Sequence, residues 1–224
     1  MVRKLVVEAI GTFFLVLTVG QVVLDPGSTG VLGPFAIASA LAVMIYAGGH
    51  ISGGHYNPAV TLAVFLRGKA TIHEAIGYWV FQLVAGAVAA TVVISIKGGG
   101  PLTVPTFALT KVMVGEALYT FALAYVVLNV ATVRGVEGNS YYGIAIGLTV
   151  LAGAYAMGAV SGGHFNPAVT VGALVMGGVA GSDVPFFLAG QLIGGAAAGL
   201  VFRALDLGND KATTATAADQ AEPA

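Results

Sequence analysis

The stretch Ser52-Gly-Gly-His-Tyr-Asn-Pro-Ala-Val-Thr61 occurs a second time as Ser161-Gly-Gly-His-Phe-Asn-Pro-Ala-Val-Thr170. Nine of the ten positions are identical, and the two copies lie 109 residues apart. In each copy a Gly-Gly pair precedes Asn and Pro. Asparagine is a favoured helix N-cap, and proline suits the first helical position. Each copy therefore predicts a loop that ends by starting a helix, at Asn57 and at Asn166.

The helices that follow these two loops are predicted to be short. The apolar run after Asn57 stops at Gly68, and the run after Asn166 stops at Gly177. A helix of about ten to twelve residues, at about 1.5 Å per residue, reaches only halfway through a hydrocarbon core of roughly 30 Å. We therefore expect two re-entrant half-helices with polar N-caps.

The composition is that of an integral membrane protein. Hydrophobic residues make up 57% of the chain and charged residues 8%, with a mean hydropathy of +0.92, whereas soluble domains carry about 25% charged residues. The lipid bilayer is thus an expected partner, and the net charge of −1 gives no indication of nucleic acid. With no cysteine and no plausible acid–base pair in the sequence, neither an enzyme, a cofactor nor a metal site is expected.

The duplication extends beyond the ten-residue stretch, and it predicts an inverted repeat. Glu8 recurs as Glu116, and Gln82 recurs as Gln191. Each unit, about 3–97 and about 110–206, then contains three full spans and one half-helix. Because three is odd, the second unit must lie upside down in the bilayer. Six apolar runs supply the spans: 5–24, 35–49, 74–96, 112–133, 141–160 and 186–205.

These patterns predict an all-α membrane protein with six transmembrane helices and two half-helices in one channel domain, residues 1–206. The Ala/Thr-rich segment 207–224 reads as a disordered tail. A cytoplasmic N-terminus satisfies the positive-inside rule, and the C-terminus is then cytoplasmic as well. In that orientation seven basic residues are cytoplasmic and two are outside: Arg3, Lys4, Arg67, Lys69, Arg134, Arg203 and Lys211 against Lys97 and Lys111.

The two half-helices are expected to meet near the membrane midplane and to form a polar track there. Irregular backbone at membrane depth is tolerated only where it is buried in protein or lines a water-filled cavity. Each helix N-terminus carries about half a positive charge, and Asn57 and Asn166 offer amide N–H donors. Such a centre repels cations, binds the oxygen of neutral solutes and interrupts a proton relay through water. It predicts a channel for neutral solutes.

The two Asn-Pro-Ala boxes, Asn57-Pro58-Ala59 and Asn166-Pro167-Ala168, resemble those of the major intrinsic protein family, the aquaporins and glycerol facilitators. The resemblance covers roughly residues 3 to 205. It implies an aquaporin-like fold, a pore within each protomer, passive bidirectional permeation and a homotetramer in a plasma or inner membrane.

One departure from the family pattern concerns selectivity. Most members have Arg after the second box, and here the residue is Val169. The other three filter positions, carried over by their distance from the asparagines, are Ile37, Ala154 and Gly163. All four are small or aliphatic, so we expect a wide, apolar outer filter. Besides water, the expected solutes are glycerol, urea, ammonia, hydrogen peroxide and uncharged metalloid hydroxides.

His55 and His164 are candidate pore-lining residues because each lies two positions before a box asparagine. Either could instead be a loop histidine that bonds to backbone. A lumen-facing, protonated His164 would supply the charge that Val169 does not. Glu8, Glu116, Gln82 and Gln191 are expected to support the re-entrant loops by accepting or donating hydrogen bonds.

Three other functions remain open from the sequence. The chain could be a channel chiefly for neutral solutes other than water. It could be a proton-coupled secondary transporter, because broken helices in inverted repeats are also a transporter design, with Glu8 and Glu116 as the ionisable candidates. It could also be a non-conducting junction protein on the same scaffold.

Overall fold

The computed structural model describes residues 1–24, 30–98 and 106–208, and these residues form a helical bundle without strands. The six long helices are α1 (Val2–Val23), α2 (Gly33–Ser52), α4 (Ile72–Lys97), α5 (Leu109–Thr132), α6 (Tyr142–Ser161) and α8 (Val184–Ala204). The two short ones are α3 (Pro58–Leu66) and α7 (Pro167–Val175), and single 3-10 turns are η1 (Gly30–Leu32) and η2 (Arg134–Val136). The predicted fold class is confirmed. Of the predicted disordered tail, 207–224, the residues from 209 onward lie outside the described residues.

The six long helices are suited to cross a membrane. Each has 20 or more residues, and their mean hydropathy ranges from 1.5 to 2.1. Their outward faces carry large apolar side chains, for example Val6, Ile10 and Phe14 on α1. Monomeric soluble proteins rarely expose apolar surface on this scale. The chain is therefore an integral, multi-pass membrane protein.

The half-helices α3 and α7 begin as the Asn-Pro pattern predicts. Asn57 has extended backbone angles, and its Oδ1 accepts a hydrogen bond from the backbone N–H of Ala59 at 2.8 Å. Asn166 caps α7 in the same way through Ala168. The residue before each asparagine, Tyr56 or Phe165, has a positive φ of 46° or 52°. Non-glycine residues hold such angles only where the surroundings enforce them, and here they turn the loop so that the helix N-terminus faces the centre.

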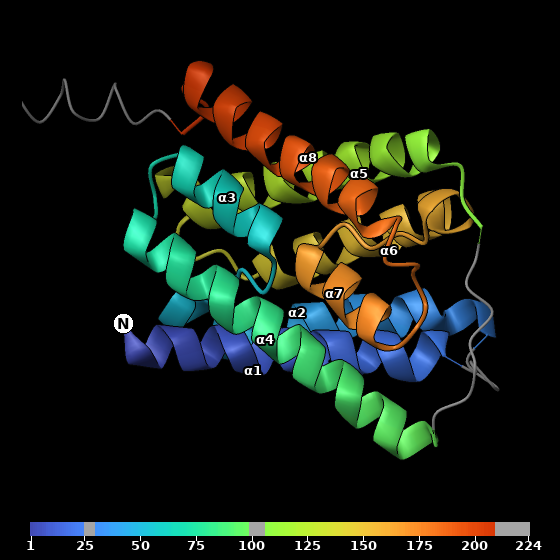
Figure 1. Cartoon of the computed structure of the whole chain (residues 1–224). Coiled ribbons are helices and arrows are strands. Elements are labelled where there is room, and N and C mark those ends of the chain that lie inside the picture. Colours follow the sequence, from blue (N-terminus) through green and yellow to red (C-terminus); the bar gives the residue numbers. More distant parts are fainter. Residues whose placement is uncertain (25–29, 99–105, 209–224) are drawn as a thin grey trace, which may run out of the picture.

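Each half-helix packs against the last long helix of the opposite repeat. Figure 1 shows α3 and α7 in the middle of the bundle, with α8 lying across α3 and α4 lying across α7. The contacts are made at glycines. A Cβ built on Gly195 of α8 would lie 2.4 Å from the carbonyl oxygen of Ala59, and one on Gly86 of α4 would lie 2.6 Å from that of Ala168. Backbone-to-backbone approach at Gly195 and Gly86 thus fixes where both half-helices begin at the centre.

We expect Gly195→Ala to destabilise the protein by about 1–3 kcal/mol, because the added methyl meets a backbone oxygen that cannot rotate away. The apparent melting temperature of the purified protein in detergent would fall. Gly158→Ala on α6 is the matched control, since a Cβ there has no atom within 4 Å and alanine favours the helix. Equal melting temperatures for both variants would contradict close packing at Gly195.

Candidate permeation pathway

The two asparagine boxes are joined directly at the centre of the bundle. Asn57 Nδ2 donates to the carbonyl oxygen of Phe165 at 2.8 Å, and Asn166 Nδ2 donates to that of Tyr56 at 2.9 Å. Each amide therefore donates one N–H to the opposite loop and has a second N–H. The two predicted centre residues are brought together, and the reciprocal bonds lock the loops at a fixed separation.

Glu8 holds the first loop from within the protein. The side chain is 0% exposed, and its two oxygens accept four hydrogen bonds. Oε1 accepts from Ser52 Oγ at 2.7 Å and from the His55 backbone N–H at 3.0 Å. Oε2 accepts from the Tyr56 backbone N–H at 2.7 Å and from Gln82 Nε2 at 2.8 Å. The carboxyl group thereby satisfies loop N–H groups that no helix pairs.

Glu116 holds the second loop with the same four contacts. Its oxygens accept from Ser161 Oγ at 2.7 Å, the His164 N–H at 3.1 Å, the Phe165 N–H at 2.6 Å and Gln191 Nε2 at 2.8 Å. This side chain is also 0% exposed. The structure thus places the four predicted support residues behind the loops rather than along an open path.

Two threonines that the sequence reasoning left without a role fix the histidines. Thr61 Oγ1 lies 3.0 Å from the Asn57 carbonyl oxygen, 3.1 Å from Gln82 Nε2 and 3.0 Å from His55 Nδ1. A hydroxyl has one proton and two lone pairs. All three contacts are hydrogen bonds only if Thr61 donates to the carbonyl while Gln82 and His55 donate to Thr61. The neutral His55 ring then carries its proton on Nδ1, and Nε2 is an acceptor.

The second copy repeats this arrangement. Thr170 Oγ1 lies 3.3 Å from the Asn166 carbonyl oxygen, 2.9 Å from Gln191 Nε2 and 3.1 Å from His164 Nδ1. The His164 ring stacks on Phe187 with centroids 4.7 Å apart. A neutral His164 therefore also presents Nε2 as an acceptor.

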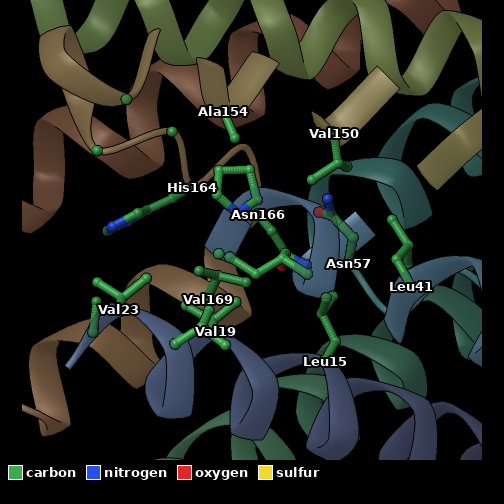
Figure 2. Close-up of a pocket in the computed structure, with 18 of the residues that line it drawn as sticks. Leu15, Val19, Val23, Leu41, Asn57, Val150, Ala154, His164, Asn166 and Val169 are labelled. Carbon is green, nitrogen blue, oxygen red and sulfur yellow. The ribbon is translucent and has the colours of Figure 1, made fainter. Parts of the chain in front are cut away.

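A cavity of about 380 Å³, which we name the α7-side cavity, runs along the asparagines. Figure 2 shows Asn57 and Asn166 at its centre, with Leu15 and Val19 of α1 on one wall. Helices α1, α2, α5 and α6 supply apolar walls at helical spacing, and the two re-entrant loops supply the polar groups. The wall residues include Leu15, Val19, Ile37, Leu41, Leu123, Val127, Ile146, Val150 and Ala154.

All four predicted filter positions line this cavity. Ile37, Ala154, Gly163 and Val169 lie around it together with His164, and Ala173 and Met176 continue the Val169 face of α7. None of the four carries a charge. A second cavity of about 490 Å³, the α3-side cavity, lies beyond His55 and is more polar, with His50, Lys69, Arg134 and Glu137 among its lining residues.

Fold and cavity together define a multi-pass membrane protein whose two half-helices meet beside an internal passage. Residues 1–157 and 103–222 each match the family described as major intrinsic protein. Aquaporin NIP1-1 of Zea mays is 33% identical over 206 residues, covering 88% of this chain and 72% of the relative. Aquaporin TIP1-1 of Arabidopsis thaliana is 38% identical over 174 residues, covering 75% and 68%.

Among solved structures, the aquaglyceroporin from Plasmodium falciparum superimposes with a TM-score of 0.74. It covers 90% of this chain and 95% of its own, and at 18% identity the likeness concerns the fold. The chain belongs to the major intrinsic protein family. It is a membrane channel for passive movement of water or small solutes, and not an enzyme.

Proposed function

We propose that this channel passes water and small uncharged solutes, excludes ions and protons, and has a wide apolar outer filter. The observation that carries the proposal is the α7-side cavity itself. It continues past both asparagines, and the residues at the four filter positions offer aliphatic groups or no side chain. A solute there meets donors at the centre and apolar walls elsewhere, which suits neutral molecules larger than water.

Exclusion of ions follows from what a charged solute would meet. The N-termini of α3 and α7 point at the centre and disfavour cations. The two carboxyl groups nearest the boxes, Glu8 and Glu116, are fully buried behind the loops with their oxygens already occupied. This arrangement supports a passive channel over a proton-coupled transporter, because neither carboxyl group is open to the cavity.

A channel chiefly for solutes other than water remains part of the proposal, with glycerol, urea, ammonia, hydrogen peroxide and metalloid hydroxides as candidates. On the family resemblance we also propose a homotetramer, a location in the plasma or inner membrane, and a single domain over residues 1–206. On the charge pattern we propose that both termini are cytoplasmic. Static light scattering on the purified protein would give its molar mass and so test the tetramer. The mass of a monomer would contradict it.

Stopped-flow light scattering on proteoliposomes tests the function. Wild-type protein is expected to accelerate water, glycerol and urea movement above protein-free vesicles, without dissipating a pH gradient that a trapped dye reports. Fast water without solute uptake would contradict the wide filter. His164→Ala should change the ratio of glycerol to water permeability if the imidazole faces the passage. Unchanged ratios would count against that role.

A further inference from the structure

The two cavities meet at one place, on the α3 side of the asparagines. Of the described residues, His55 and Val127 line both cavities. On α5 the wall residues follow one helical stripe, in which Leu123 lines the α7-side cavity, Val127 lines both, and Val130 lines the α3-side cavity. On α3, Val60 lines the first cavity and Val64 the second. His55 and Val127 therefore lie at the boundary between the two cavities.

The equivalent pair of residues in the other repeat lies along a single cavity. The repeat offsets that relate Glu8 to Glu116 and Asn57 to Asn166 relate Val19 to Val127 and His55 to His164. Val19 and His164 lie within the single α7-side cavity. Figure 2 shows Val19, Val169 and His164 around this open space. The same pair of residue types thus lines one continuous cavity in one half and the boundary between two cavities in the other.

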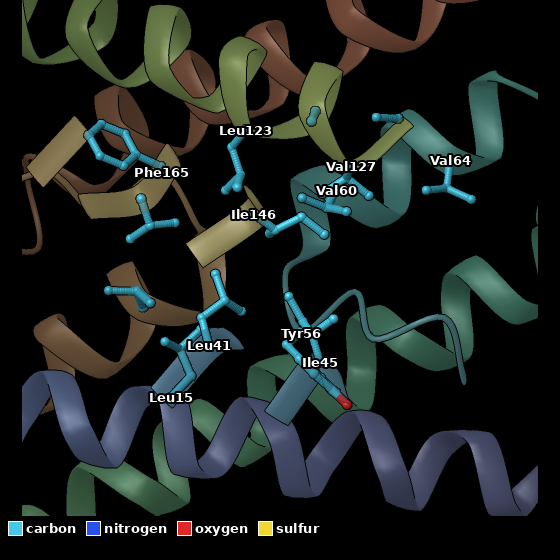
Figure 3. Packing of buried hydrophobic residues seen from close by; sticks show 14 of the residues in the cluster. Leu15, Leu41, Ile45, Tyr56, Val60, Val64, Leu123, Val127, Ile146 and Phe165 are labelled. Atoms are coloured by element: carbon cyan, nitrogen blue, oxygen red, sulfur yellow. The ribbon is translucent and has the colours of Figure 1, made fainter. Parts of the chain in front are cut away.

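The difference between the halves has a physical cause in the second helix of each repeat. The residue that corresponds to Ala154 of α6 is Ile45 of α2, 109 positions earlier. Ala154 lines the α7-side cavity. Ile45 is 1% exposed within the apolar core cluster that also contains Val127 and Val60, and Figure 3 shows it beside Tyr56. The three additional carbons of Ile45 fill space that is open at Ala154.

We propose that the size-selecting constriction of this channel lies between His55 and Val127, and not at the four outer filter positions. The inference rests on the proposed channel function. A permeating molecule meets the aliphatic Val127 on one side and an imidazole on the other. The His55 Nε2 acceptor lies beside Gly53 of the α3-side cavity, where an added Cβ would approach it to 3.1 Å. The constriction thus combines an apolar wall with one acceptor, which favours narrow solutes that donate a hydrogen bond.

The test compares Val127→Ala with its repeat equivalent Val19→Ala in proteoliposomes, using glycerol, erythritol and the wider, branched pentaerythritol as probes. Val127→Ala is expected to raise erythritol and pentaerythritol influx relative to glycerol by on the order of tenfold, and Val19→Ala to leave these ratios within about twofold of wild type. Val127→Leu should change the ratios in the opposite direction. Misfolding cannot produce opposite changes from one position, because it lowers every rate.

The contrary results separate this inference from the proposed function. If wild-type protein conducts but Val19→Ala widens the solute range as much as Val127→Ala, or neither variant does, the constriction is not at Val127 and the inference fails alone. If wild-type vesicles take up water, glycerol and urea no faster than protein-free vesicles, the proposed function fails and the inference falls with it.

Discussion

Glu8→Gln is expected to cause a large loss of stability although it conserves the size of the side chain. Each oxygen of Glu8 accepts two hydrogen bonds, so an amide NH₂ in place of either oxygen would face two donors. A buried donor left without an acceptor costs about 1–3 kcal/mol, which gives roughly 2–6 kcal/mol for the pair. The measurement is the apparent melting temperature in detergent, together with the yield of monodisperse protein.

Two controls separate this effect from loss of a charge alone. Glu116→Gln should be destabilising to a similar degree, because the second loop has the same four contacts. Glu74→Gln changes a carboxyl group near the start of α4 that pairs with the part-exposed Lys4 at 2.7 Å. It should cost little, since glutamine can also complete the capping box that Glu74 forms with Thr71, and exposed ion pairs contribute about 0–1 kcal/mol. A Glu8→Gln protein as stable as Glu74→Gln would show that the loops do not depend on the buried carboxyl group.

The local structure was predictable where one residue type decides it. Asn57-Pro58 and Asn166-Pro167 gave the starts of both half-helices correctly, because an N-cap followed by proline has few alternatives. The third span was predicted from Glu74 but begins at Ile72. The reason is readable in Thr71-Ile-His-Glu74, where the Thr71 side chain and the Glu74 side chain form a capping box. The second span begins at Gly33 because Pro34 is accommodated in the first helical turn.

The contacts between repeats were not predictable from the same patterns. The asparagine amides were expected to offer N–H donors to the passage, and the structure shows that each also donates to the carbonyl of Tyr56 or Phe165 on the opposite loop. Such a bond depends on how closely the loops approach, which Gly86 and Gly195 set through packing across the bundle. Likewise, the sequence shows that Ile45 and Ala154 occupy equivalent positions in the two repeats. That Ala154 lines a cavity while Ile45 is buried in the core depends on three-dimensional packing.

Val169→Arg is expected to cause the largest loss of solute transport. Val169 lines the α7-side cavity near Ile37, Ala154 and Gly163, so a guanidinium there would both narrow the passage and place a fixed charge in it. Glycerol and urea uptake should fall by on the order of tenfold or more, equivalent to about 1.4 kcal/mol or more in barrier height. Water should be less affected, since it is smaller and can hydrogen-bond to the new donors.

Val169→Met narrows the passage without adding a charge, with a side chain shorter than that of arginine. If width alone limits the solutes, both variants reduce glycerol uptake, and the ratio of urea to glycerol changes in the same direction in both. If the guanidinium acts through charge and hydrogen bonding, Val169→Arg reduces uptake further, and the ratio of urea to glycerol changes only in that variant. Wild-type uptake in both variants would contradict a position for Val169 on the pathway. The proposed constriction at Val127 lies in series with this position. Opening one narrow section cannot relieve another, so solute uptake should remain low in the double variant Val127→Ala/Val169→Arg.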